Sequence, residues 1–472
     1  MRSTFYGLEI ARKGLFMNQK ALDVTGHNIA NADTPGYTRQ RLTTQAVAPD
    51  AHGGLFASPV KGQVGGGVEV MELSQIRDHF LDIQYRNQNT LVGRWDIRNS
   101  ALEYIEDIFG EASGYGLHTQ LGEFFSQIQE LVKDPTSPEI RTLLRQSAEK
   151  VTEVIRQYAS QLQDLRGQQD YALEVSVKQV NSWAQKIAAL NEQIFRFELS
   201  GEKANDLRDS RNLILDQLSE MVNIRVEENA DGQLSVYIGN QTLVQHTTAY
   251  EIAYDDSGPM IAIDPDWQNE ITGGKLKGYL EIRDGEGLGA PDGNTVMGIP
   301  YYMNKLDQFA RAFASSFNET NAMGILDNGE SGGDLFQGDS SGNITALTIT
   351  ISDAWKNDIN AIATSGAGEM AYNENALRFL ALQNSEGFEE SIASIISDLA
   401  VDASYTKDMK KTSEILLDAL DNNRQSVSGV SLDEEMTNMV RYQQAYAAAA
   451  RMITAIDEAI DIIINRMGIV GR

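Results

Sequence analysis

The sequence predicts a mainly α-helical fold with an inserted β domain, in which terminal coiled-coil helices flank a long antiparallel helical body. Apolar residues repeat every seven positions at both ends of the chain. Residues 73–223 show helical periodicity, whereas residues 224–283 hold short runs typical of a small antiparallel β domain, bounded by turn residues. At roughly 100 to 200 residues per domain, 472 residues predict two to four domains.

The N-terminal end carries two apolar rows that each repeat every seven residues. One row is Leu8, Leu15, Leu22 and Ile29, and the other is Ile10, Met17 and Val24. This period keeps one face of a helix toward a partner and indicates a left-handed coiled coil. Burying the four residues of the first row contributes about 6 to 12 kcal/mol, whereas ordering thirty residues costs roughly 30 to 60 kcal/mol. We therefore expect this helix to need several neighbours.

The C-terminal end shows the same period over a helix expected from Ser431 to about Met467. One row is Leu432, Met439, Tyr446, Ile453, Ile460 and Met467, and its companion is Met436, Gln443, Ala450, Asp457 and Ile464. Ser431 followed by acidic residues is typical of a helix N-terminus. The alternative is an amphipathic helix packed on its own domain. We interpret the apolar members of the rows at both ends as an assembly interface, and expect both ends to be largely disordered in the free monomer.

The stretch "NADTPGYTRQR", residues 31–41, ends the first helix abruptly. Thr34 precedes a proline and is therefore disfavoured in helical conformation, and Pro35-Gly36 suits a type II turn. The residues that follow, "YTRQRLTTQAV" and later "VGGGVEVMEL", favour extended structure. We expect an extended arm over residues 41–75.

The block "GHNIANADTPGYTRQ" resembles the signature of the axial proteins of the bacterial flagellum, the rod, hook and hook-associated family. The family pattern Ala-Asn-x-x-Thr-Pro-Gly-Tyr is met here by Ala30, Asn31, Thr34, Pro35, Gly36 and Tyr37. Residues 429–461 are similar to the closing helix of the same family. The long helical segments 77–111, 120–149 and 189–220 resemble the hook-associated members, whereas rod and hook subunits are expected to become β-rich soon after the signature.

The resemblance implies a structural component that joins hook to filament and assembles when its terminal helices fold into a helical tube. It implies export by the flagellar type III apparatus without a cleaved signal peptide, and an extracellular location on the flagellum. The implied partners are neighbouring copies, hook protein, a second junction protein and an export chaperone, for which the C-terminal helix is the first candidate surface. A hook or rod subunit is the alternative within the family, and an adhesin displayed on the flagellum is the alternative outside it.

The predicted organisation alternates helical and extended segments. Residues 1–40 with 429–472 form the terminal coiled-coil domain, and 41–75 form the arm. The helical body combines 76–223 with 296–323 and 372–425. Residues 224–283 form the inserted β domain, and 284–295 and 324–371 are loops with a short β segment.

Composition and motifs argue against several other functions. The formal charge of -28 opposes attraction to nucleic acid, and charged residues interrupt every long apolar run, so no membrane insertion is expected. There is no cysteine, the five histidines form no zinc motif, and the acidic, glycine-rich stretch 327–343 lacks the spacing of a calcium loop. We therefore expect no enzyme activity, no cofactor and no metal site.

Overall fold

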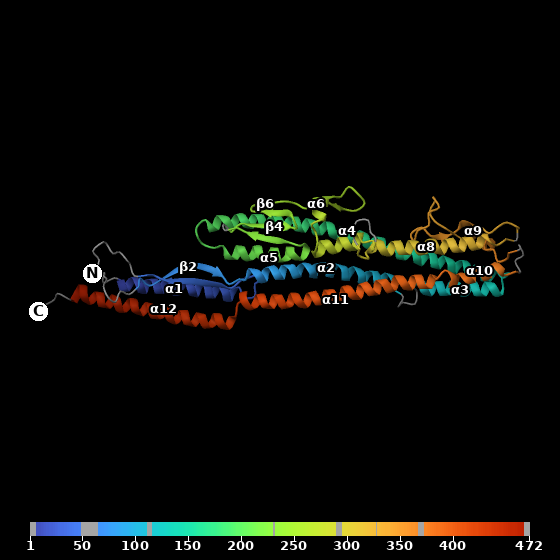
Figure 1. Cartoon of the computed structure of the whole chain (residues 1–472). Helices are drawn as coiled ribbons and strands as arrows, with labels where there is room; N and C mark the ends of the chain where they lie inside the picture. Colours follow the sequence, from blue (N-terminus) through green and yellow to red (C-terminus); the bar gives the residue numbers. More distant parts are fainter. Residues whose placement is uncertain are drawn as a thin grey trace.

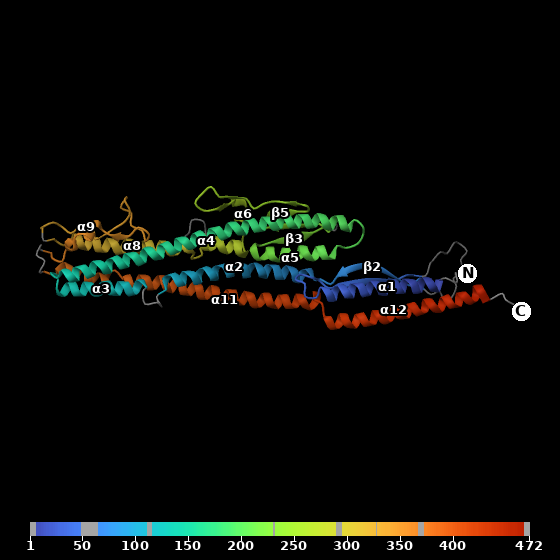
Figure 2. The same ribbon diagram turned by 180° about the vertical axis from the view of Figure 1, so that it is seen from behind.

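The molecule is elongated, with the terminal helices side by side at one end and the helical body extending away from them (Figures 1 and 2). The structure, a computed structural model, describes residues 6–48, 65–110, 116–229, 232–288, 295–326, 328–366 and 372–466. The terminal pair consists of α1 (Tyr6–Ala30) and α12 (Leu432–Asp461), the latter followed by a π-helical turn, η3 (Ile462–Arg466). Met467, the last residue of the predicted row, lies outside the described residues.

The predicted arm forms a two-stranded antiparallel ribbon beside α1. Its strands are β1 (Gln40–Ala46) and β2 (Val68–Gln75), with Gln40 opposite Gln75 and Ala46 opposite Val68. The ribbon runs along α1 rather than extending into solvent (Figure 1).

The body is built on two antiparallel helices that continue from the terminal pair, α2 (His79–Phe109) and α11 (Phe388–Ser428). Around them lie α3 (Leu117–Lys133), α4 (Pro138–Glu198), α5 (Asn205–Met221), α7 (Gly274–Asp284), α8 (Ile299–Ala322) and α10 (Glu374–Ser385). At 1.5 Å per residue, the 61 residues of α4 span about 92 Å. This helix starts with the Ser137 cap and with Pro138 in its first turn.

Helix α4 joins two hydrophobic cores. Its first half packs with α3, α8 and α11 around aromatic residues that include Phe124, Phe313 and Phe317. Its second half, including Val177 and Ile187, packs with α5, α7 and the β strands. The apolar residues of α4 that are spaced mostly three or four apart are buried, except that Leu190 is only partly buried; the buried ones are Leu162, Leu165, Leu173, Val177, Val180, Ile187 and Ile194.

The β region is an antiparallel meander in the order β3-β4-β5-β6. Its strands are β3 (Arg225–Glu228), β4 (Leu234–Ile238), β5 (Gln241–Gln245) and β6 (Thr248–Ala249), followed by the paired β7 (Tyr254–Asp255) and β8 (Ala262–Ile263). A short helix, α6 (Pro265–Gln268), comes next.

The expectation that β structure continues to residue 283 is wrong, because residues 274–284 form α7. Leu276 and Leu280 lie one helical turn apart and are buried in the second core. The glycines of this helix allow close packing: a Cβ on Gly278 would lie 2.9 Å from Cβ of Ile97 on α2.

Residues 324–371 contain the expected short β segment, in which β10 (Thr350–Ile351) pairs with β9 (Phe336–Gln337). They also contain two helical elements that the sequence did not predict, α9 (Asp353–Asn357) and the 3-10 turn η2 (Ile359–Ala361). Trp355 is fully buried against Phe336, so part of this segment belongs to the first core. Short elements of this kind have too few residues to show a periodic pattern.

Candidate assembly interface

The two terminal helices pack antiparallel along a narrow seam. At the free end, a Cβ on Gly7 would lie 3.5 Å from Cδ1 of Ile456. At the end next to the body, Nδ2 of Asn28 donates to Oε2 of Glu435 at 3.2 Å. As predicted, Ser431 caps α12 by accepting a hydrogen bond from the Glu434 amide, with three acids in the first turn.

Small and polar residues of α1, rather than its two apolar rows, form the centre of this seam. The buried residues of α1 are Ala11, Asn18, Ala21, Thr25 and Asn28. The predicted residues Leu8, Leu15, Leu22 and Ile29, with Ile10, Met17 and Val24, are partly buried and flank these positions. On α12, Met439, Ile453 and Ile460 are partly buried and share the seam face with Ile456.

The companion row of α12 does not face α1. The row that does is displaced by one residue, because Glu435 and Ile456 touch α1 whereas Met436 and Asp457 are exposed. A seven-residue period shows that a helix carries an apolar row, but it does not show which of several adjacent rows faces the partner helix. Moving by one residue turns the position around the helix by about 100°.

Most of α12 is therefore open to solvent in a single chain. Glu435 is its one buried residue. Its exposed large apolar residues are Leu432, Met436, Val440, Tyr446 and Met452, followed by Ile462, Ile463 and Ile464 in η3. Large apolar residues exposed in this number on one long helix are typical of a surface that packs against another chain.

The signature stretch forms the predicted type II turn. The Tyr37 amide donates to the Thr34 carbonyl at 3.1 Å, and Gly36 has a φ of 80°, as the third position of this turn requires. Thr34, Pro35 and Gly36 are exposed. The turn ends α1 at Ala30 and directs residues 37–40 back across the helix, while Asn31 donates to the His27 carbonyl.

The returning segment is held by Asn28, whose side chain is 1% exposed and makes four hydrogen bonds. Its Oδ1 accepts from the Tyr37 hydroxyl at 2.8 Å and from the Gln40 amide at 3.0 Å. Its Nδ2 donates to the Gln40 carbonyl at 2.9 Å and to Glu435. Burial, together with nearby carboxylates, raises the pKa of Tyr37, which keeps its hydroxyl a donor.

Arg39 ties the same segment to the first turn of α12. Its guanidinium lies 2.6 Å from Oε1 of Glu435 and 2.8 Å from Oε2 of Glu434. Glu435 is only 3% exposed, so its charge is compensated by Arg39 and by the Asn28 amide. Such charge-assisted bonds fix geometry more strongly than neutral ones.

A second set of contacts fastens the segment to α5 of the body. The Thr38 amide donates to Oδ2 of Asp209 at 3.0 Å, and Nε2 of Gln40 donates to Oδ1 of Asp206 at 2.8 Å. Arg77 bridges Asp82 and the Thr38 hydroxyl. Burial is the main cause of the raised pKa of Asp209. We name these polar contacts among residues 27–40, 77–82, 205–209 and 431–435 the signature joint.

Sequence reasoning identified the turn but missed the residues that make the joint. Asn28, Arg39 and Gln40 belong to the family block, yet the turn pattern itself points only to residues 34–37. Glu435 and Asp209 carry no local signal, because their partners lie 396 and 171 residues away in the sequence.

Two hollows flank the terminal pair. One, of about 780 Å³, lies between α1, β2 and the loop that links α4 to α5. The other, of about 540 Å³, lies at the joint beneath the signature turn. Among the described residues no group of three or more His, Cys, Asp or Glu could hold a metal ion. Within the same residues, no helix has the length and hydropathy needed to cross a bilayer.

Comparisons with known proteins agree along the chain. Residues 102–336 match the flagellar hook-associated protein FlgK helical domain. Residues 8–38 match the flagella basal body rod protein model, and residues 422–467 match the C-terminal model of flagellar basal body rod FlgEFG proteins.

Similar full-length proteins carry one name. Flagellar hook-associated protein 1 of Bacillus subtilis (strain 168) is 35% identical, with 100% of both chains covered. The Escherichia coli (strain K12) protein of that name is 26% identical over 96% of this chain and 98% of its own. The flagellar hook junction protein FlgK from Burkholderia pseudomallei superposes with a TM-score of 0.58 at 16% identity, covering 73% of this chain and 100% of that one, which shows a shared fold.

Proposed function

Because this chain belongs to the flagellar hook-associated protein 1 family and is a hook-filament junction protein of the bacterial flagellum, we propose that its terminal helix pair is completed only by neighbouring copies. The burial pattern of α12 carries this proposal. Five large apolar residues of α12 are 37–57% exposed in the described chain, whereas the body has two closed cores.

The energetic gain on assembly is sizeable. Full burial of a Leu, Ile, Met or Val side chain contributes about 1.5 to 3 kcal/mol. Seven such residues of α12 and η3 are roughly half exposed, so covering them contributes roughly 5 to 10 kcal/mol per copy. This gain offsets part of the conformational entropy that is lost when the two helices become ordered in the tube.

Order in the free chain then decreases from the joint toward the tips. Asn28, Thr38, Gln40 and Glu435 are buried and fastened to the body, so the joint stays formed, whereas the outer turns of α1 and α12 open easily. Open tips suit passage through a narrow export channel without a cleaved signal peptide.

The proposed partners follow from this position in the flagellum. The terminal pair contacts neighbouring copies, and the two ends of the ring of copies meet hook protein and a second junction protein. A flagellar export chaperone covers the exposed face of α12 before export. The family consists of structural flagellar proteins, and the proposal assigns no catalytic step to any residue.

Amide hydrogen exchange on the purified full-length monomer tests the mechanism. We expect weak protection in residues 436–461, strong protection in α2 and α4, and protection of the outer α12 amides once the chain is part of isolated flagella. Strong protection of the whole of α12 in dilute monomer would contradict fold-on-assembly.

A gene deletion tests the position in the flagellum. Cells without this chain should build finished hooks and release flagellin into the medium, and the released flagellin is measured by immunoblotting. Missing or truncated hooks would instead indicate a hook or rod subunit.

A further inference from the structure

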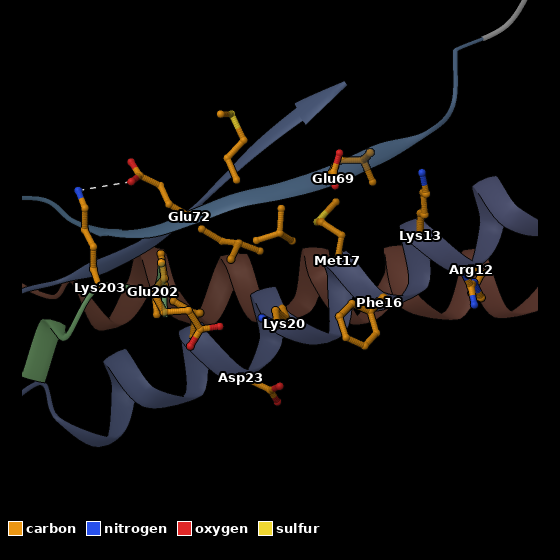
Figure 3. A pocket seen from close by; sticks show the side chains of 17 residues that line it. Arg12, Lys13, Phe16, Met17, Lys20, Asp23, Glu69, Glu72, Glu202 and Lys203 are labelled. Atoms are coloured by element: carbon orange, nitrogen blue, oxygen red, sulfur yellow. Dashed lines mark ion pairs between the residues drawn. The ribbon is translucent and has the colours of Figure 1, made fainter. Parts of the chain in front are cut away.

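The hollow beside α1 is a groove with an apolar floor and a basic wall. Figure 3 shows α1 below and β2 above, with Met17 pointing toward the strand. Val24, Leu42 and Val70 continue the apolar lining. Phe16 is 60% exposed at the open side of the groove. A hollow of about 780 Å³ is large enough for several side chains of a docked helix.

The wall formed by α1 carries more positive than negative charge. Arg12, Lys13 and Lys20 line it, opposed on the same helix by Asp23. Arg12 pairs with Glu9 outside the groove, whereas no ion pair joins Lys13 or Lys20 to another residue that the structure describes. On the opposite wall Glu72 is already paired with Lys203 at 3.4 Å, and Glu69 and Glu202 complete the lining (Figure 3).

The far end of α12 has the complementary composition. Asp457 and Glu458 are exposed and form no ion pair within the described part of the chain, and Asp461 follows one turn later. The next three residues, Ile462, Ile463 and Ile464, are 49%, 45% and 67% exposed. We name residues 457–464 the acidic tip.

The acidic tip cannot reach the groove of its own chain. In the antiparallel pair Gly7 lies beside Ile456 and Asn28 beside Glu435, so the groove centre near Met17 lies opposite residue 446. The tip begins about 11 residues and ends about 18 residues further along α12, roughly 17 to 27 Å away at 1.5 Å per residue. An occupant of matching chemistry must therefore come from another molecule.

We propose that the groove between α1 and β2 binds the acidic tip of a second copy. This inference rests on the proposed assembly of terminal pairs, and it names the contact. The isoleucines cover Phe16 and the apolar floor, and the tip carboxylates lie beside Lys13 and Lys20. The groove and the acidic tip are different surfaces of the chain, so the contact is head-to-tail and propagates into a ring or helix rather than closing as a dimer. The contact displaces neighbouring copies along the long axis of the molecule by roughly 17 to 27 Å.

Cysteine cross-linking tests the contact without background, because the chain has no cysteine. Flagella are isolated from cells whose chain carries both Phe16→Cys and Ile463→Cys, then oxidised and run on a non-reducing gel. We expect a ladder of covalent multimers. A matched pair, Leu143→Cys with Ile463→Cys, places the first cysteine at an exposed site on the body and should give none.

Mixing separates contacts between copies from contacts within one chain. Cells that produce one chain with Phe16→Cys and another with Ile463→Cys should give dimers but no longer ladder. Incorporation of the double variant without cross-links would overturn the inference and leave fold-on-assembly standing. If unmodified chains were absent from isolated flagella, the proposed function itself would fail. Should the first pair block incorporation, Lys13→Cys with Glu458→Cys reports the same contact.

Charge reversal gives an independent readout. Lys13→Glu with Lys20→Glu should abolish motility while the chain is still secreted into the medium. Adding Asp457→Lys and Glu458→Lys to the same chain should restore motility, because the attraction is re-formed with opposite signs. Unchanged motility in the first variant, or no rescue in the second, would count against the contact.

Discussion

Asn28→Ala is the most informative single perturbation of the signature joint. The substitution removes four hydrogen bonds from a site that is 1% exposed and leaves groups of Gln40, Tyr37 and Glu435 without this partner. A buried hydrogen bond contributes about 0.5 to 1.5 kcal/mol, and water that enters the opened site compensates part of the loss. We therefore expect the free energy of local opening at the joint to fall by about 3 kcal/mol.

Amide exchange at Gln40 measures this loss directly, because its amide donates to Asn28. Where exchange proceeds through local opening, 1.4 kcal/mol corresponds to a factor of ten. The Gln40 amide should thus exchange about 100-fold faster in the variant. Asn31→Ala is the matched control, since the Asn31 side chain makes only exposed hydrogen bonds, donating to the His27 carbonyl and accepting from the Thr34 hydroxyl; its loss should change the rate by less than about threefold.

Two outcomes would refute the reasoning about the joint. Equal Gln40 exchange in Asn28→Ala and the unmodified chain would show that the buried amide does not hold the returning segment. Equal acceleration by Asn31→Ala would show that the turn as a whole, rather than the Asn28 contacts, decides stability.

Three further predictions concern the body and its link to the terminal pair. Gly93→Ala should lower the free energy of unfolding by about 1 to 3 kcal/mol, because the new Cβ would lie 2.1 Å from a backbone carbonyl of α5. Gly122→Ala is the control, since its Cβ would meet nothing within 4 Å and should not destabilise the chain. Thermal unfolding compares the two variants. Because the pKa of Asp209 is raised, the folded state keeps the proton of this carboxyl to higher pH than the unfolded state does. The free energy of unfolding therefore falls as pH rises from about 4 through the folded pKa. Asp209→Asn should flatten that fall, as measured by urea titrations at several pH values. Arg39→Leu leaves Glu435 buried without its cation and should cost about 3 to 5 kcal/mol, with motility lost on soft agar and largely regained when Glu435→Leu is added.

The amino-acid sequence by itself determined the features that depend on neighbouring residues. Pro35-Gly36 enforces a turn because proline restricts φ and glycine accepts a positive φ. Ser431 starts α12 because its side chain satisfies an unpaired amide. The long helices of the body followed from apolar spacing that is regular over many turns. The family signature was equally local, so the family could be identified from it.

Only the tertiary structure decided which faces meet. The apolar rows at residues 8–29 flank a seam of small residues, since two long helices approach closely where the side chains between them are small. Residues 274–284 became a helix because burial against α2 and α4 outweighs the poor helix propensity of their glycines. The joint is also tertiary, because Glu435 and Asp209 meet residues 28–39 only after hundreds of intervening residues have folded. Short-range preferences fix where helices begin and end, whereas the choice among neighbouring faces of a helix depends on packing partners that are distant in sequence.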